Sequence, residues 1–126
     1  MKITQEFLDR YFTNITSHYT EYSRAGTIGV ITDTQSRAEE IFETLLLDYK
    51  EEDVVGTIMS KGRIEVQLVT GDVMLWATPA ISSKGCKFKG VIFDGEMNIK
   101  EDILNHIILP MCIHCTKNTA EIFTCY

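Results

Sequence analysis

The sequence predicts a single α/β domain of three layers, in which helices cover a mainly parallel sheet that also contains an antiparallel hairpin. Short β-branched runs alternate with segments of helical periodicity, a pattern that favours strands connected through helices. Residues 1–126 contain no linker, repeat or low-complexity tract, and 44% of them are hydrophobic. A chain of this length has room for one core but not for two.

The first part of the chain predicts a helix, a strand and a second helix. Apolar and aromatic residues recur at helical spacing over 4–23, and the β-branched run 27–32 is typical of a strand. Ser36 is followed three residues later by Glu39, a capping box that predicts the start of the second helix. The buried face of this helix extends to Tyr49, and its other side is strongly acidic.

Alternating hydrophobicity predicts a hairpin in the middle of the chain. Residues 64–69 have a period of two, a Thr-Gly-Asp turn follows at 70–72, and a second extended run covers 73–77. A polar loop at 79–85 then separates the hairpin from the next strand.

The last third of the chain predicts a strand, a helix and a final strand. The apolar run 88–96 forms the first of these. Asn98 with Glu101 predicts the cap of the helix, and Pro110 stops it. The run 120–126 is strand-like.

Two carboxylates follow the apolar run of this last third. Asp94 and Glu96 stand one residue apart at the carboxyl end of a predicted buried strand, where many nucleotide-hydrolysing folds hold Mg²⁺ and orient water. The alternative is the polar end of a core strand, with Gly95 supplying the turn.

The composition limits the kinds of partner that this chain is expected to bind. The formal net charge of −6 disfavours direct binding of the isolated chain to a nucleic-acid backbone, because such binding depends on Lys and Arg. No apolar run approaches the roughly 20 residues of a membrane span, and the first residues lack the apolar region of a signal peptide. We expect no membrane partner and a cytoplasmic location, the host cytoplasm if the protein is viral.

The succession of these motifs resembles the ATPase core of the large terminases, the P-loop NTPases that drive phage DNA packaging. The resemblance covers nearly the whole chain in order, and its specificity lies in the succession. Its parts are a strand and helix (29–49), a hairpin with a TGD turn (63–77), a Ser-rich loop (82–88), a strand that ends in acidic residues (91–96), the end of a helix (109–110) and a coupling strand (121–124).

The resemblance implies a site that binds ATP and Mg²⁺. Asp94 matches the acid that holds Mg²⁺, and Lys2 and Thr4 align with the end of the phosphate loop. The chain departs from the family at both places: the strand and glycines before Lys2 are absent, Ile3 replaces the hydroxyl that binds Mg²⁺, and the catalytic carboxylate moves to Glu96. We expect no nuclease domain of the kind that the family carries.

A truncated, P-loop-NTPase-like domain without independent ATP hydrolysis is therefore the expected class. The resemblance implies a phage-type protein that acts in or on a DNA-packaging or DNA-processing complex. Self-assembly or a protein partner is expected, with nucleic acid reached through the complex.

Two charged clusters suggest further contacts. The basic cluster consists of Lys84, Lys87 and Lys89. It either contacts phosphate or nucleic acid or belongs to a solvated loop. The acidic cluster is either a solvated helix face or a surface for a basic partner, which gives an alternative function: a non-enzymatic protein that inhibits a nucleic-acid-handling machine. The cluster consists of Glu39, Glu40, Glu43, Asp48, Glu51, Glu52 and Asp53.

Cysteine spacing allows a metal site. Cys112 and Cys115 form a CxxC that could hold Zn²⁺, with a further ligand from Cys86, Cys125 or His106. The alternative is that these are reduced cysteines in or near the core.

The single tryptophan also has two interpretations. Trp76 is either an anchor in the core or an interface, or a platform for base stacking.

Overall fold

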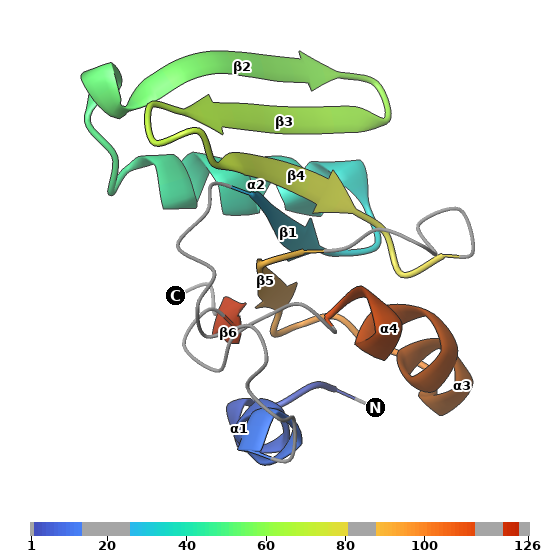
Figure 1. Ribbon diagram of the computed structural model, residues 1–126. Helices are drawn as coiled ribbons and strands as arrows, with labels where there is room; N and C mark the ends of the chain where they lie inside the picture. The colour runs from blue at the N-terminus through green and yellow to red at the C-terminus, as the bar shows by residue number, and fades with distance from the viewer. Residues whose placement is uncertain (1, 14–25, 81–87, 113–119, 124–126) are drawn as a thin grey trace.

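The computed structural model describes residues 2–13, 26–80, 88–112 and 120–123, which form a six-stranded sheet with helices on both faces (Figure 1). Of the helix expected over 4–23, the structure describes the first part only. In chain order the elements are α1 (Gln5–Thr13), β1 (Thr27–Ile31), α2 (Gln35–Leu46), η1 (Glu51–Asp53), β2 (Val54–Ser60), β3 (Arg63–Leu68), β4 (Val73–Ala77), β5 (Gly90–Asp94), α3 (Glu101–Ile103), the π-helical turn η3 (Leu104–Ile108), α4 (Leu109–Met111) and β6 (Ala120–Phe123).

The sheet is mixed, with the strand order β2-β3-β4-β1-β5-β6. β1 pairs in parallel with β4 and β5, and β5 pairs in parallel with β6. β3 pairs antiparallel with both β2 and β4. The expected mainly parallel sheet therefore describes only the β4-β1-β5-β6 part, and an antiparallel extension makes up the rest.

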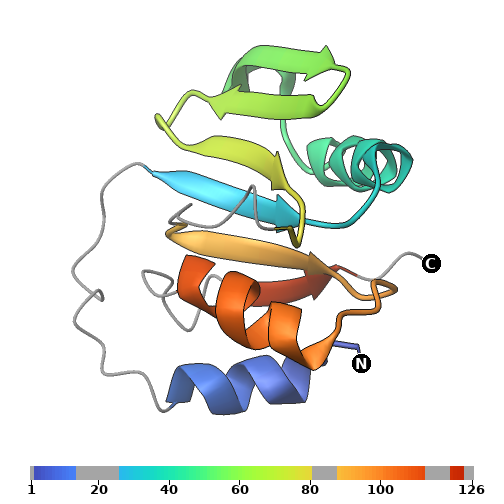
Figure 2. The same ribbon diagram turned by 90° about the vertical axis from the view of Figure 1, so that its right-hand side faces the viewer.

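The central strands are apolar on both faces because helices cover both sides of the sheet. Val30 and Ile92 face α2, whereas Ile31, Val91 and Phe93 face the opposite layer. All five residues of β5 are buried. Figure 2 shows α2 on one side of the sheet, with α1 and the α3–η3–α4 helix on the other.

The expected hairpin is present as β3 and β4. The amide of Leu68 donates to the carbonyl of Asp72 at 2.8 Å, and the amide of Gly71 donates to the carbonyl of Leu68 at 2.9 Å. Gly71 has a φ of 92°, which a residue without Cβ adopts readily. The Thr-Gly-Asp turn thus fixes the register of β4, whose other edge pairs with β1.

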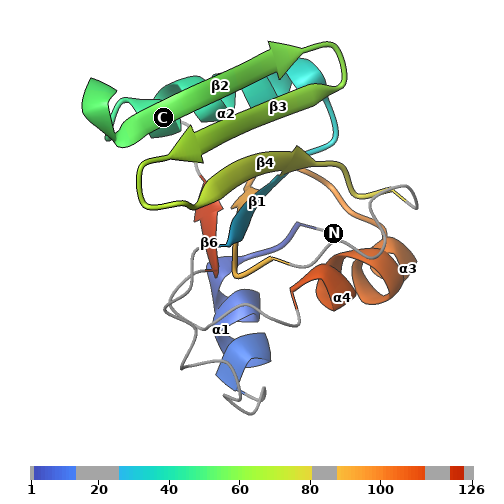
Figure 3. The ribbon, with the colours of Figure 1, turned by 45° about the horizontal axis from the view of Figure 1, so that its top comes forward.

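β2 is a strand that the sequence pattern did not predict. It lies at the outer edge of the sheet, beside β3 (Figure 3). Its register shifts between Val54 and Gly56, and its residues alternate only between half-buried and exposed, so it lacks a clear apolar face. A two-residue turn with Gly62 at a φ of 81° connects it to β3.

The start of α2 differs from the expected capping box. Thr34, rather than Ser36, is the N-cap, and its side chain accepts a hydrogen bond from the amide of Arg37 at 3.3 Å. Ser36 lies within the first turn. The helix ends at Leu46, so Tyr49 lies beyond it and is half exposed rather than on a buried helix face.

The helix after β5 also begins and ends later than expected. Its N-cap is Lys100, without a side-chain bond, and Asn98 instead forms an isolated bridge with Lys2. Pro110 does not stop the helix, which continues to Met111. Pro110 directly follows the π-helical turn, in which the amide of Leu109 donates to the carbonyl of Leu104.

Candidate functional site: the Asp94 cluster

The carboxyl ends of β1 and β5 meet at one edge of the sheet because the two strands are parallel. Thr32 follows β1 directly, and Asp94 is the last residue of β5. The hydroxyl of Thr32 donates to Oδ2 of Asp94 at 2.8 Å. Both residues are buried, so this carboxylate is placed inside the domain rather than at its surface.

Arg37, in the first turn of α2, reaches across to the same carboxylate. Its Nε donates to Oδ2 of Asp94 and its Nη2 to Oδ1, each at 3.1 Å. Only 13% of the Arg37 side chain and 3% of the Asp94 side chain are exposed. The pair is therefore a buried, two-pronged ion pair that connects α2 to β5.

Two further carboxylates lie around the same guanidinium. Nη1 of Arg37 is 3.1 Å from Oε2 of Glu40, and Nη2 is 3.6 Å from Oε2 of Glu96. The amide of Glu96 donates to Oδ1 of Asp94 at 3.0 Å, which forms the turn after β5. We call Thr32, Arg37, Asp94 and Glu96 the Asp94 cluster.

The site residues Asp94 and Glu96 are thus brought together, but around an arginine. Both oxygens of Asp94 accept hydrogen bonds from Arg37, whereas Glu96 is largely exposed. Neither Arg37 nor Thr32 was predicted as a site residue from the sequence. The available signal was that Arg37 is the only basic residue of an otherwise acidic helix.

Trp76 on β4 supports the edge where the cluster lies. Its indole Nε1 donates to the carbonyl of Thr32 at 3.0 Å, and its ring packs beside the core under α2. These contacts fit the interpretation of Trp76 as a core anchor, because its single polar group is already used.

The pKa of Asp94 is lowered from its ordinary value. Burial by itself raises this pKa, but the hydrogen bonds from Arg37, the Glu96 amide and Thr32, together with the charge of Arg37, outweigh it. Asp94 is consequently ionised over the whole neutral range.

We expect the protein to lose stability in acid through this carboxylate. Because the folded pKa is below the unfolded value of about 3.9, the contribution is fully present above that value and is lost as the pH falls through the folded pKa. Urea unfolding between about pH 6 and about pH 3 should show a steeper loss for the wild type than for Asp94→Asn. Asp72, whose pKa is also lowered, affects both proteins equally, so equal slopes would contradict this assignment.

Lys2 and Thr4, the expected phosphate-binding residues, are placed differently from each other. Lys2 is exposed and pairs with Asn98, which brings the start of the chain beside the turn after β5. The hydroxyl of Thr4 accepts from the amide of Phe7 at 3.1 Å and so caps α1. Thr4 is therefore used within its own helix.

Of the basic cluster, the structure describes only Lys89, which lies away from Asp94. Lys84 and Lys87 lie outside the described residues. Lys89 precedes β5, at the end of the strand opposite Asp94, and its Nζ is 2.6 Å from Oδ1 of Asp72. That carboxylate also accepts a hydrogen bond from the amide of Gly26. The Lys89–Asp72 pair therefore helps to hold the amino ends of β1 and β5 together.

Of the residues expected to hold zinc, the structure describes Cys112 and the exposed His106. Cys112 is buried, and its Sγ donates to the carbonyl of Ile108 at 3.3 Å, which fits a reduced core cysteine. Cys86, Cys115 and Cys125 lie outside the described residues. Within 2–13, 26–80, 88–112 and 120–123, no three His, Cys, Asp or Glu side chains gather as a metal site.

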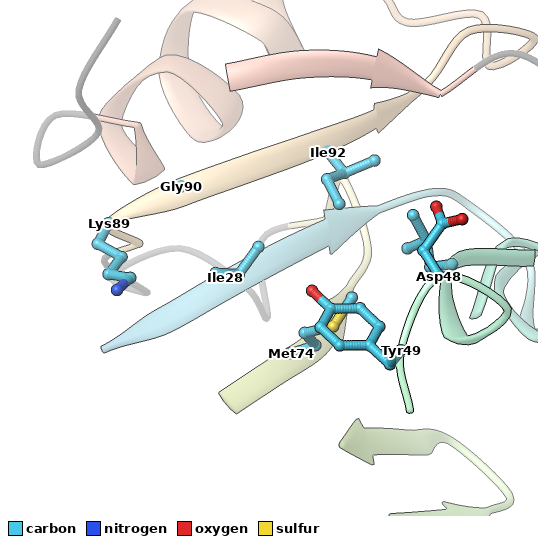
Figure 4. Close-up of a pocket in the computed structure, with 8 residues that line it drawn as sticks. Ile28, Asp48, Tyr49, Met74, Lys89, Gly90 and Ile92 are labelled. Carbon is cyan, nitrogen blue, oxygen red and sulfur yellow. The ribbon is translucent and has the colours of Figure 1, made fainter. Parts of the chain in front are cut away.

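A pocket of about 450 Å³ lies at the amino ends of β1 and β5, on the face covered by α2. Ile28, Met74 and Ile92 form its apolar floor (Figure 4). Lys89 lies on one side and Asp48 with Tyr49 on the other. Its size suits a small molecule, but its rim carries both signs of charge and its cation pairs with Asp72.

Comparisons with protein-family models, with curated proteins and with solved structures find no match for this chain. Among the helices that the structure describes, none is long and apolar enough to cross a membrane. The class of the protein is therefore defined by the fold itself, an α/β domain with a mixed sheet and an ion pair at its carboxyl edge.

Proposed function

We propose that this protein is a non-hydrolysing, terminase-like domain that acts by binding within a DNA-packaging or DNA-processing complex. The observation that carries the non-hydrolysing part is the double hydrogen bond from Arg37 to Asp94. The terminase-like part is supported by the order of the sequence motifs.

A carboxylate that holds Mg²⁺ for phosphoryl transfer must offer oxygen lone pairs to the ion. Asp94 instead directs both oxygens to a guanidinium, and Oδ2 also accepts from Thr32. A magnesium ion at these oxygens would have to displace Arg37 or lie against its positive charge. The cluster favours a structural carboxylate over a catalytic one.

We expect millimolar ATP with Mg²⁺ to leave the melting temperature unchanged. A ligand at about 100 times its Kd would add about 2.7 kcal/mol to the stability, a shift of several degrees for a domain of this size. The measurement is a thermal melt with ATP–Mg²⁺, ATP–EDTA or Mg²⁺ alone. A rise that needs both ATP and Mg²⁺, and that Asp94→Asn abolishes, would overturn the proposal.

A second candidate is the acidic, non-enzymatic inhibitor of a nucleic-acid-handling machine. It is favoured by a run of exposed carboxylates along α2 and into η1, where a basic partner would find them on one segment of the chain. The nature of the partner separates the two candidates: a packaging component for the first, a nucleic-acid enzyme for the second. The exposed carboxylates are those of Glu40, Glu43, Asp48, Glu51 and Glu52.

A further inference from the structure

The outer edge of β2 has few of the usual protections against strand pairing, and its one irregularity is the shift of register between Val54 and Gly56 near its start. β2 pairs with β3 on one side, and no other strand among the described residues pairs with it. Its seven residues, Val-Val-Gly-Thr-Ile-Met-Ser, include no charge and no proline. Proteins normally protect such an edge with lysine, proline or a covering segment, because its free backbone groups can bind another strand.

The opposite edge of the sheet provides a contrast. At β6 the amide of Ile122 donates to Oε1 of Gln5, and α1 contacts the strand. That edge is therefore covered by a helix of the same chain, whereas β2 has no such cover in the described part.

Apolar side chains are exposed along β2. Val55 is 67% exposed and Met59 46%. Met59 pairs with Ile64 and Thr57 with Val66, and both of these β3 residues face α2. Thr57 and Met59 therefore share one face of the edge. Val55 lies at the shift of register between Val54 and Gly56, where strict alternation ends, and its exposed side chain extends the apolar surface toward the start of the strand.

Charges of opposite sign flank the strand at its two ends. Glu51, Glu52 and Asp53 precede it, whereas Lys61 and Arg63 follow it. An antiparallel second copy of β2 would bring the acidic end of each copy beside the basic end of the other. A parallel copy would bring like charges together, so the charges select the antiparallel arrangement.

We propose that β2 pairs antiparallel with β2 of a second copy of this chain, around a two-fold axis at Thr57, to form a dimer with one continuous sheet. In this register Val55 lies opposite Met59 of the second copy, which pairs the two exposed apolar side chains. The acidic segment Glu51–Asp53 of each copy then lies at the same end of the paired strands as Lys61 of the other. A two-fold axis is the expected symmetry for such a self-complementary edge.

The dimer is expected to be weak. Strand pairing with one row of side chains buries less than the roughly 1,600 Å² of a standard stable interface, so we expect the dimer population to depend on protein concentration. This inference rests on β2 and its flanking charges alone, so it is independent of the proposed function and of the Asp94 cluster.

The two-fold axis permits a sharp test at Thr57, whose side chain is exposed in the single chain. Thr57→Lys places two like charges opposite each other, as Thr57→Glu does, and each variant should be monomeric. An equimolar mixture of the two places unlike charges across the axis and should recover the dimer. Gln67→Lys, at an exposed position on the neighbouring strand β3, is the charge-matched control and should dimerise as the wild type does.

Sedimentation velocity from roughly 1 to 200 μM would measure these states. A wild type that stays monomeric over this range, or a Thr57→Lys variant that dimerises as tightly as the wild type, would overturn the proposal. A mixture that stays monomeric would overturn the register centred on Thr57. If Thr57→Lys fails to fold, as circular dichroism would reveal, Met59→Glu tests the same edge and should likewise abolish the dimer.

Discussion

Replacing Arg37 with alanine is expected to lower the free energy of unfolding by about 3–5 kcal/mol, because the carboxylate of Asp94 is then buried without its counter-ion. The effect is large for a domain whose total stability is on the order of 5–15 kcal/mol. Equilibrium unfolding in urea, followed by the fluorescence of Trp76, measures it. Trp76 is a suitable probe because it contacts Thr32 within the same region.

Arg10→Ala is the matched control for this variant. Arg10 also pairs with a carboxylate, Glu6 at 3.7 Å, but both side chains are largely exposed. Such a pair contributes at most about 1 kcal/mol, so the control should cost far less than Arg37→Ala. Equal losses in the two variants would show that the buried pair has no special role.

A double replacement separates the charge from the packing. Arg37→Met with Asp94→Leu removes both charges and keeps apolar volume, so it should be more stable than either single replacement. This outcome is expected if Arg37 serves to neutralise Asp94. It would also be consistent with a carboxylate that the fold holds in place without using it for chemistry.

Replacing Phe88 with alanine is expected to cost about 3–5 kcal/mol, the usual range for emptying an aromatic position in a core. The side chain is buried and its ring lies against Gly29 of β1. A Cβ at Gly29 would lie 2.7 Å from Cδ2 and Cε2 of the ring, closer than carbon atoms approach. Gly29→Ala should therefore cost about 1–3 kcal/mol by overpacking.

The two replacements should be strongly coupled. In the double variant the new methyl group of Gly29→Ala occupies part of the space that Phe88→Ala vacates, so the double loss should be smaller than the sum of the single losses. Gly56→Ala is the control glycine, because its Cβ would meet only the end of the Gln67 side chain, with Oε1 at 3.4 Å and Cδ at 3.9 Å. Additive losses from Gly29→Ala and Phe88→Ala would contradict the close contact seen here.

Local sequence patterns predicted the elements whose burial is regular. The apolar runs of β1 and β5 and the alternation in β3 give the same strands in the structure, because each faces a core directly. β2 escaped prediction because it is half exposed and contains Gly56 beside a shift of register. Edge strands give a weaker pattern because burial acts on fewer of their residues.

Local sequence patterns did not predict the helix boundaries or the contacts of the Asp94 cluster. Thr34 and Ser36 are both good N-cap residues. Which of them begins the helix depends on where the chain turns after β1. The contact between Arg37 and Asp94 joins residues 57 positions apart, so no pattern within a window of the sequence contains it. Asp94 and Glu96 were identified as a pair from the sequence, but the arginine that determines their role was not.

The position of β1 in the middle of the sheet affects how the chain assembles. Thr27 pairs with Val73 and Ile28 with Gly90, so β1 is synthesised before either of the strands that flank it. At synthesis rates of about 5–20 residues per second, a few seconds pass between the synthesis of β1 and that of the strands with which it pairs. β2, β3 and β4, by contrast, are consecutive hairpins that can pair as they emerge. The pairing of β1 with β4 and β5 then joins these hairpin strands to the rest of the sheet.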